Sequence, residues 1–243
     1  MALVANIGNT NISLGLSSDG GIQESWRLPV DDFKDAAIFP ERVRGEIQAA
    51  AVAGVNPEVQ QQFCDFLESE FDLAIRLVMR ESIQLVNKCW PPDTVGIDRL
   101  LNALAAHHLF PIDDVIVVDF GTAMSFSVVN GVGEFLGGAI APGLRMSARA
   151  LHDQTAALPE VEPGKVDSAI GSNTDSAIRS GLQWGCAGAL DRILDGLLKE
   201  LPEALISGTG GDLNWFLEHT NHEIEPQPNL TLLGIAHAAG LAG

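Results

Sequence analysis

Apolar and polar positions along this chain follow two periods, one typical of strands and one typical of helices. Short apolar runs bounded by Gly, Pro, Asn or Asp indicate strands, and apolar residues three or four positions apart indicate helices. Strands are predicted at residues 2–6, 11–17, 22–28, 49–54, 73–78, 115–119, 122–129, 134–141 and 203–207. Helices are predicted at residues 31–48, 57–70, 95–110, 173–200, 211–219 and 231–241, with a long loop at 156–172.

The order of these elements predicts an α/β fold, in which mixed sheets carry helices on their faces. Pro91 and Pro92 interrupt the pattern, and after Pro111 it starts again with a second set of strands and helices. We therefore expect two domains, residues 1–111 and residues 112–243.

One local pattern, a strand, a polar turn with a glycine and a second strand, occurs once in each half. It reads LVANIGNTNISLGL at residues 3–16 and VIVVDFGTAMSFSVV at residues 115–129. A glycine in the turn lets the backbone approach a phosphate, and nearby Asn and Thr side chains add donors. An acid before the glycine, such as Asp119, can hold a hydrated divalent cation, but Asn6 stands at the matching position of the first turn. One such turn is also typical of an ordinary hairpin, whereas two in register favour a phosphate site.

Composition narrows the classes of partner. The 243-residue chain has a formal net charge of −18, which repels nucleic-acid backbones, so we expect no nucleic-acid partner. No apolar run reaches the roughly 20 residues of a membrane span, and no basic residue precedes Arg27, so neither a membrane partner nor a signal peptide is expected. The three cysteines form no CxxC pair, which is typical of a reducing compartment and predicts a cytoplasmic location.

Asp98 and Arg99 stand side by side in the segment GIDR, residues 96–99, at the predicted start of a helix. Asp98 is either an acid that stabilises the helix N-terminus or a base that accepts the proton of a substrate hydroxyl. In the second case Arg99 would hold a substrate carboxylate through paired N–H bonds. The residues alone leave both interpretations open.

Other glycine-rich and histidine segments carry less information. GTGGD, residues 208–212, is either a tight connection or a turn that admits an adenine or a ribose. The chain contains no G-x-G-x-x-G and no G-x-x-x-x-G-K-[ST], which excludes the two commonest nucleotide-binding folds. The pairs His107-His108 and His219/His222 have no third ligand at a suitable spacing, and we interpret them as helix-surface residues.

Taken in order, these segments resemble type III pantothenate kinase, a family of the acetate kinase, sugar kinase, Hsp70 and actin superfamily. The resemblance extends nearly from end to end of the chain. It rests on NIGNTN at 6–11, GIDR at 96–99, DFGTA at 119–123, GGAIAPG at 137–143, TAALP at 155–159, GSNTDSAIRSG at 171–181 and GTGG at 208–211.

The resemblance implies two ribonuclease-H-like domains of the actin-like ATPase type, with ATP in the interdomain cleft. It implies ATP-dependent phosphorylation of pantothenate to 4'-phosphopantothenate, the first step of coenzyme A biosynthesis. The implied cofactors besides ATP are magnesium and a monovalent cation, potassium or ammonium. The family is a homodimer with its substrate sites at the subunit interface, so a second copy of the chain is the implied protein partner.

Carried over position by position, the resemblance assigns roles to single residues. Asp98 matches the catalytic base, Thr174 matches a substrate-contacting threonine, and Asp119 matches a ligand of the monovalent cation. The substrate loop consists of Gly96, Ile97, Asp98 and Arg99. The residues that match the ATP site are Asn6, Ile7, Gly8, Asn9, Thr10, Asn11, Ile12, Ser13 and Thr122.

This chain departs from the family pattern in three places. Asn6 replaces the acid of the first turn, Cys89 and Trp90 stand near the place of a common tyrosine, and Leu233 replaces a common acid. Asn6 keeps an oxygen that can bind a magnesium-bound water but has no negative charge. Because a charge-assisted hydrogen bond is roughly twice as strong as a neutral one, we expect a weakened metal site.

Two alternatives to a pantothenate kinase follow from these departures. The first is a catalytically weak or inactive paralogue that acts as a ligand-binding or regulatory protein, which Asn6 favours. The second is a kinase of the same superfamily that acts on another hydroxy acid. Asp98, Arg99, Asp119 and Thr174 favour the pantothenate kinase.

Overall fold

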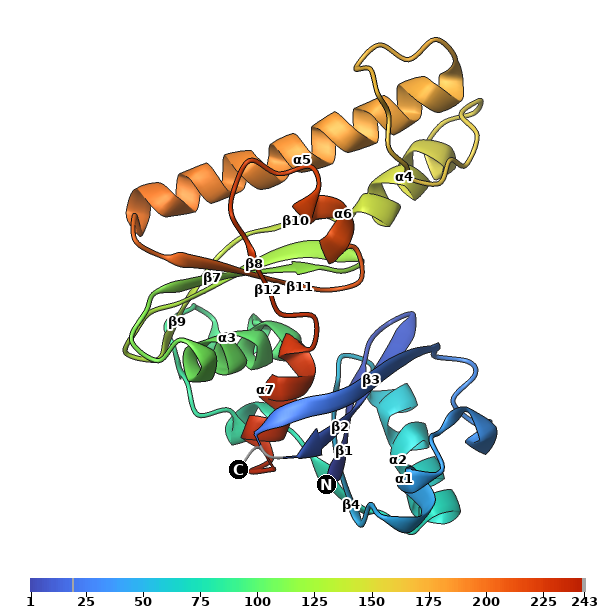
Figure 1. Ribbon diagram of the computed structural model, residues 1–243, viewed down its shortest axis with the longest axis vertical. Helices are drawn as coiled ribbons and strands as arrows, with labels where there is room; N and C mark the ends of the chain where they lie inside the picture. The colour runs from blue at the N-terminus through green and yellow to red at the C-terminus, as the bar shows by residue number, and fades with distance from the viewer. Residues whose placement is uncertain (19, 242–243) are drawn as a thin grey trace. The chain divides into compact units, whose positions relative to one another are not determined.

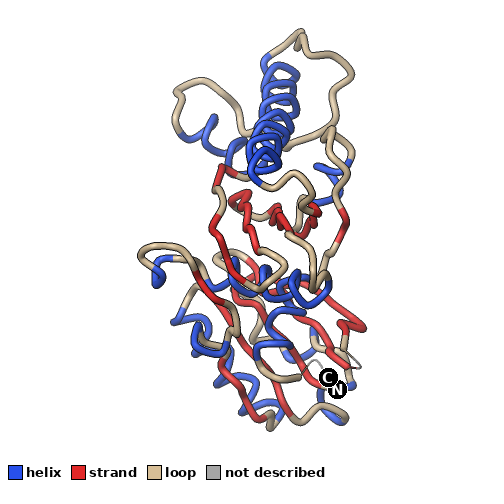
Figure 2. The backbone as a smooth tube through the Cα atoms, turned by 90° about the vertical axis from the view of Figure 1, so that its left-hand side faces the viewer, coloured by secondary structure: helices blue, strands red, loops and turns tan. Residues whose placement is uncertain are grey.

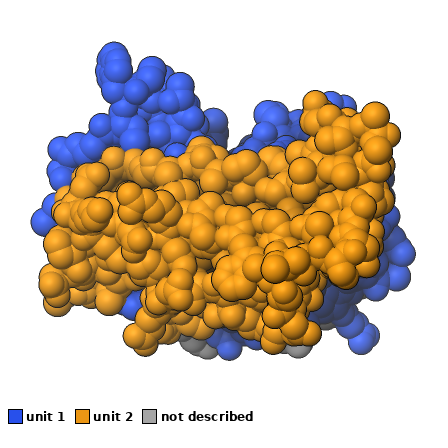
Figure 3. Space-filling model, turned by 90° about the horizontal axis from the view of Figure 1, so that it is seen from above, with its two compact units in different colours: residues 1–111, 132–135, 229–243 blue, residues 112–131, 136–228 orange. Residues whose placement is uncertain are grey.

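The computed structural model describes residues 1–18 and 20–241 and forms two compact units (Figures 1 and 3). The first unit contains residues 1–111, 132–135 and 229–243, and the second contains residues 112–131 and 136–228. The division into domains at residues 111 and 112 stays a prediction. No helix in the described ranges is both long enough and apolar enough to cross a bilayer.

The first unit is built on a five-stranded mixed sheet in the order β3-β2-β1-β4-β5. Strands β1, β2 and β3 form an antiparallel meander, and β4 and β5 run parallel to β1. The strands predicted in this part of the chain are confirmed. Their bounds are β1 Ala2–Ile7, β2 Asn11–Ser18, β3 Gly21–Pro29, β4 Ala49–Gly54 and β5 Ala74–Leu77.

Helices cover both faces of the first sheet (Figures 1 and 2). Leu3, Ala5 and Ile7 of β1 are fully buried in one core together with Phe63 of α2 (Pro57–Phe71). The alternate positions face α3 (Ile97–Leu109) and α7 (Leu230–Ala238), because a Cβ added at Gly15 would lie 3.1 Å from a methyl group of Leu232. The sheet is therefore buried on both sides, as expected for an α/β fold.

The helix predicted at residues 31–48 is wrong. This segment contains only the 3-10 turn η1 (Ala36–Ile38) and the short helix α1 (Arg42–Gly45). Pro40 provides no backbone N–H, and the residue before it, Phe39, has the extended backbone that a following proline favours. The apolar residues of the segment serve a different purpose, because Phe33 and Phe39 pack against the ring of Phe63.

The second unit is built on strands β12, β11, β7 and β8, in that order, with β10 also paired to β8. β7 and β8 are antiparallel, and β11 runs parallel to β7. The long helix α5 (Thr174–Glu200) lies along one face of this sheet (Figure 1). The remaining bounds are β7 Val115–Phe120, β8 Ala123–Val129, β10 Ile140–Pro142, α4 Leu144–Asp153, β11 Leu205–Thr209, α6 Leu213–Leu217 and β12 Glu225–Pro226.

Two predictions for the second half of the chain need correction. The strand predicted at 134–141 is two strands, β9 (Glu134–Gly137) and β10, because Gly137 and Gly138 adopt positive φ angles of 112° and 142°. Helix α4 was not predicted, since it is short and mostly polar, and only Leu144 and Ala148 on it are buried. Two other short 3-10 turns and a strand precede α3: η2 Arg80–Ser82, β6 Val86–Asn87 and η3 Pro92–Thr94.

Helices α3 and α7 pack closely because Gly234 has no side chain. A Cβ atom at Gly234 would lie 2.2 Å from the carbonyl oxygen of Leu101. Farther along the same pair, the rings of His108 and His237 stack 4.0 Å apart at an interplanar angle of 3°. Burial lowers the pKa of both imidazoles, so the stacked pair is neutral near pH 7.

We predict that Gly234→Ala lowers the free energy of unfolding by about 1–3 kcal/mol, because the new methyl group must push α7 away from the backbone of α3. Urea unfolding followed by circular dichroism measures this change. Gly196→Ala in α5 is the control: no atom lies within 4 Å of its added Cβ. That variant is expected to gain about 0.5–1 kcal/mol from helix propensity. Unchanged stability in Gly234→Ala would show that the two helices do not need this close approach.

Candidate active site

The first glycine turn joins β1 and β2 and is closed by a backbone hydrogen bond. The N–H of Gly8 donates to the carbonyl of Asn11 over 2.9 Å, and the carbonyl of Thr10 accepts from the N–H of Val30 over 3.1 Å. Asn9, Thr10 and Asn11 are exposed. The turn therefore presents amide and hydroxyl groups, as expected of a segment that contacts phosphates.

The apolar residues of this segment lie in the core. Ile7 and Ile12 are fully buried on the face of the sheet that packs against α2. A contact of either residue with a nucleotide would therefore involve its backbone and not its side chain. Ile7 and Ile12 help to position the turn by anchoring β1 and β2 in the core.

Asn6 belongs to a row of polar side chains across three strands. It lies opposite Ser13 on β2, and Ser13 lies opposite Arg27 on β3. Nε of Arg27 donates to Oγ of Ser13 over 3.2 Å. Residues directly opposite one another share a face of the sheet, so a guanidinium stands two strands from the amide. The sequence patterns did not single out Arg27, which the pairing register alone reveals.

The second glycine turn follows β7, where Asp119 lies opposite Ser125 on one side and Thr209 on the other. Thr122 at the tip is exposed. The segment GGAIAPG packs on this turn: the N–H of Gly143 donates to the carbonyl of Thr122 over 3.2 Å. A Cβ at Gly143 would lie 2.4 Å from the carbonyl oxygens of Gly121 and Thr122, so only glycine permits this approach.

The GTGG turn lies against the same segment. Gly210 has a φ of +100°, and a Cβ there would lie 2.6 Å from Oδ1 of Asp119. The N–H of Asp212 donates to the carbonyl of Phe120 over 3.0 Å, and Nε of Arg145 lies 3.5 Å from Oδ1 of Asp212. Within the second unit, the turn that contains Asp119 is thus joined by two other segments, residues 137–143 and residues 208–212. Sequence reasoning missed Arg145 because it stands in the unpredicted helix α4.

The GIDR segment begins α3, and its glycine lies close to the carboxylate of Asp98. A Cβ at Gly96 would lie 2.4 Å from Oδ1 of Asp98, so the carboxylate folds back over this residue. The same oxygen accepts the N–H of Arg99 over 2.9 Å. Asp98 is half-buried in the first turn of the helix, where the helix dipole stabilises the charged form of a carboxylate.

Arg99 is half-buried beside Asp98, and its guanidinium carbon lies 5.5 Å from the ring centroid of Phe135. Burial lowers the pKa of Arg99, whereas nearby Cys89 and Asp98 raise it. Cys89 is half-buried, and its N–H donates to Oδ1 of Asn87 over 3.0 Å. Trp90, the neighbour of Cys89, is 90% exposed. Near the position where the resemblance implies a tyrosine, the chain therefore has a half-buried thiol and an exposed indole.

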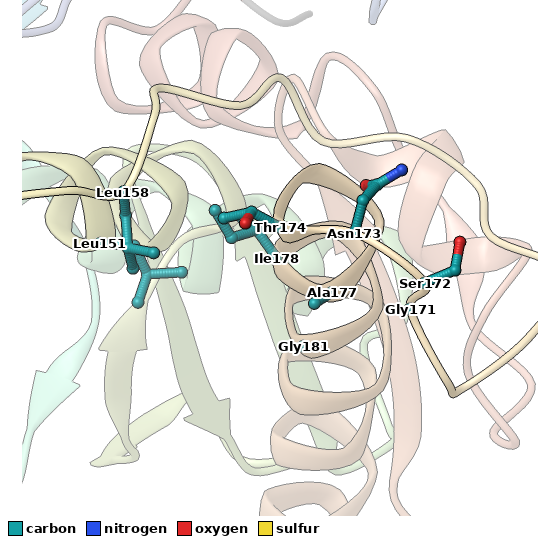
Figure 4. Close-up of a pocket in the computed structure, with 9 residues that line it drawn as sticks. All are labelled: Leu151, Leu158, Gly171, Ser172, Asn173, Thr174, Ala177, Ile178 and Gly181. Atoms are coloured by element: carbon teal, nitrogen blue, oxygen red, sulfur yellow. The ribbon is translucent and has the colours of Figure 1, made fainter.

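Thr174 is the first residue of α5 and lines an open pocket in the second unit (Figure 4). Leu151 and Leu158 lie on the side of the pocket that faces Thr174 and Ile178. Oδ1 of Asn173 accepts the N–H of Ser176 over 2.8 Å and caps the helix. The loop before it packs tightly, because a Cβ at Gly171 would lie 2.2 Å from the backbone nitrogen of Ala177.

In residues 1–18 and 20–241, no three His, Cys, Asp or Glu side chains are grouped as a metal site would require. A cation at Asp119 would therefore take its other ligands from backbone carbonyls, from water or from a bound nucleotide. Oxygen ligands of this kind suit magnesium and the alkali cations.

Comparison with known proteins agrees with this arrangement. A chain described as a Baf-family transcriptional activator from Campylobacter jejuni superimposes with a TM-score of 0.64 at 18% identity, covering 97% of this chain and 96% of the other. An inorganic polyphosphate/ATP-glucomannokinase from Arthrobacter sp. strain KM superimposes with a TM-score of 0.51 at 13% identity, covering 100% and 99%. The chain thus shares the fold of these proteins, an α/β fold with two mixed sheets flanked by helices.

Sequence comparison identifies the family. The type III pantothenate kinase of Rhodococcus jostii (strain RHA1) is 34% identical over 255 residues, which cover 97% of this chain and 93% of that protein. The family model described as type III pantothenate kinase matches residues 2–196. The chain belongs to the type III pantothenate kinase family.

Proposed function

We propose that this protein transfers the γ-phosphoryl group of ATP to the primary hydroxyl of pantothenate. The product would be 4'-phosphopantothenate, and the reaction would be the first step of coenzyme A biosynthesis. The observation that carries the proposal is the family match, which extends through the segment where Asp98 and Arg99 adjoin at the start of α3.

Phosphoryl transfer requires a protein mainly to position the reacting groups and to neutralise charge. In this proposal the two glycine turns perform both tasks. In the proposed site residues 6–13 contact the phosphates of ATP, and Thr122 contacts the nucleotide from the second turn. The exposed Asn9, Thr10 and Asn11 offer donors to the phosphate oxygens. Arg27, in the same row as Asn6, adds a positive charge at the edge of this group.

Asp98 and Arg99 divide the recognition of pantothenate between them. Asp98 accepts the proton of the primary hydroxyl as it attacks the γ-phosphorus, and Arg99 holds the carboxylate at the other end of the substrate. Since Oδ1 of Asp98 is held by the N–H of Arg99, its second oxygen Oδ2 is the one proposed to take the proton.

Two cations complete the proposed site. Magnesium would neutralise the negative charge that develops on the phosphoryl group during the transfer. Asn6 would hold one of its water ligands. Asp119 would hold potassium or ammonium, with carbonyl oxygens of the turn that Gly143 and Gly210 pack against.

The direct test uses the purified protein with ATP, magnesium, potassium and pantothenate. Formation of 4'-phosphopantothenate and ADP in equal amounts supports the proposed function. Absence of product with pantothenate, together with ATP-dependent phosphorylation of another hydroxy acid, would assign a different acceptor. No transfer to any acceptor would overturn the kinase proposal.

Asp98→Asn is expected to lower kcat at least a hundredfold, the usual contribution of a general base, while ATP binding changes little. The amide keeps the size of the side chain but cannot accept the proton. Steady-state kinetics and ATP titration measure the two effects. Asp93→Asn is the matched control, because Asp93 is exposed in η3 just before α3 and should tolerate the change. Full activity of Asp98→Asn would remove Asp98 from the role of base.

Asn6→Asp is expected to shift the magnesium dependence of the reaction to lower concentration and to raise the rate at limiting magnesium by about ten- to hundredfold. The reason is that a carboxylate holds a metal-bound water more strongly than an amide, by about 1.5–3 kcal/mol. Rates measured over a magnesium series at saturating ATP test this.

The control for that series is Asn56→Asp, which adds the same charge in the same unit at the N-cap of α2, where Asp and Asn are equally good. Should Asn6→Asp leave both the rate and the magnesium dependence as they were, the metal does not depend on residue 6.

The homodimer is also part of the proposal, with Thr174 of one copy contacting the substrate held by Asp98 of the other. Co-expression of the inactive variants Asp98→Asn and Thr174→Ala tests it. A mixed dimer then carries one intact site, so roughly a quarter of the native activity should return when chains pair at random. Mixtures that stay as inactive as either variant alone would mean that each site is built from one chain.

A further inference from the structure

The side chain of Phe135 is fully buried, yet its ring meets a charged group of the proposed substrate loop. The guanidinium carbon of Arg99 lies 5.5 Å from the centroid of the ring. This distance is within the range of a cation–π interaction, in which the ring face attracts the cation. Neither the sequence patterns nor the family motifs had pointed to Phe135.

The backbone of Phe135 is fixed by the strand that leads toward the substrate loop. β6 pairs with β9 in parallel, with Val86 opposite Glu134 and Asn87 opposite Phe135. The N–H of Lys88 donates to the carbonyl of Phe135 over 2.9 Å, and Nζ of Lys88 lies 2.8 Å from Oε1 of Glu134. A short piece of sheet therefore ties the position of the ring to the segment that runs into GIDR.

The same segment is braced at its other end by Asn87. Its Oδ1 accepts the N–H of Cys89 over 3.0 Å, and its Nδ2 donates to the carbonyl of Pro92 over 3.1 Å. The guanidinium of Arg80 also donates to the carbonyl of Val95, just before Gly96. The same group of residues thus holds the substrate loop and the ring of Phe135, and Arg99 of that loop contacts the ring.

An aromatic ring has an effect on Arg99 that a carboxylate partner would not have. Burial lowers the pKa of Arg99, which means that part of its hydration is lost. The π face of Phe135 offsets part of this loss and fixes the orientation of the guanidinium, but it does not neutralise the charge. A planar guanidinium held in one orientation suits paired hydrogen bonds to a carboxylate.

We propose that Phe135 is a positioning residue, which orients Arg99 for the carboxylate of the substrate. This inference rests on the proposed function, because it gives Arg99 the same ligand. It adds that discrimination between a substrate with a carboxylate and one without it depends on a ring that itself touches no substrate.

The test compares pantothenate with the neutral alcohol in which a hydroxymethyl group replaces the carboxylate. In Phe135→Leu the KM for pantothenate should rise about two- to thirtyfold, the range that a cation–π contact corresponds to. kcat, the KM for ATP and the affinity for the alcohol should change little, so the preference for the carboxylate falls by the same factor. The alcohol is assayed as a substrate or, without turnover, as a competitive inhibitor.

The matched control is Phe63→Leu, the same change at a fully buried ring of the first unit that packs on Phe33 and Phe39. It should lower thermal stability to a comparable degree without changing the carboxylate preference. A loss of preference in both variants would mean that Phe135 acts only through general stability, which overturns the inference.

Because Phe135→Leu leaves a gap in the core, a second series keeps the shape of the ring. Phenylalanines with one, two and three fluorine atoms, incorporated at position 135, weaken the π face stepwise while they remain apolar. The KM for pantothenate should rise stepwise with fluorination and should not do so for the same series at position 63. A constant KM across the series would overturn the inference while native turnover of pantothenate still stands. If the native protein phosphorylates no pantothenate, the proposed function itself fails.

Discussion

The candidate site depends on one constraint. At several glycines a carboxylate or carbonyl oxygen lies so close to the backbone that the Cβ atom of another residue would collide with it. At Gly96, Gly143 and Gly210 a Cβ atom would lie 2.4–2.6 Å from a carboxylate or carbonyl oxygen. Real Cβ atoms do not approach other atoms this closely, so Gly143 and Gly210, which lie against backbone atoms, are required by their neighbours, and a side chain at Gly96 would displace the carboxylate of Asp98. Asp98 and Asp119, the two acids with proposed roles, are each held against such a glycine.

The same constraint explains how a chain with a net charge of −18 can hold a triphosphate. Long-range attraction is unavailable, so binding must rest on local groups: amides of tight turns, one or two cations and bound metal. Arg27 is placed by a short-range contact to the hydroxyl of Ser13. A few oriented charges at close range outweigh many distant ones that water screens.

Local patterns determined much of what could be predicted from the sequence. The strands on either side of each turn follow from their short apolar runs, and α2 and α3 follow from apolar residues at helical spacing. The segment 31–48 could not be predicted in this way, because its phenylalanines Phe33 and Phe39 pack against Phe63 without belonging to a continuous helix. Pro40 was the contrary signal within it.

The contacts that the sequence could not supply are those set by pairing between distant segments. Phe135 meets Arg99 because β9 pairs with β6, a strand of only two residues that no periodicity reveals. Arg27 joins the row of Asn6 through a register of three strands. The motif residues could be named one by one from resemblance, whereas the residues that position them appear only when the pairing is known.

Asn6 illustrates how these two kinds of information combine. From the sequence alone an amide at this position predicts a weakened metal site, because it removes a charge. In the fold, the amide keeps its place opposite Ser13, and a guanidinium lies two strands away in the same row. The turn therefore retains its shape and its donors, and what is lost is one negative charge near a metal. In the proposed site, an exchange of this kind would lower the affinity for magnesium by degrees and would leave the positions of the backbone groups that phosphoryl transfer uses as they are.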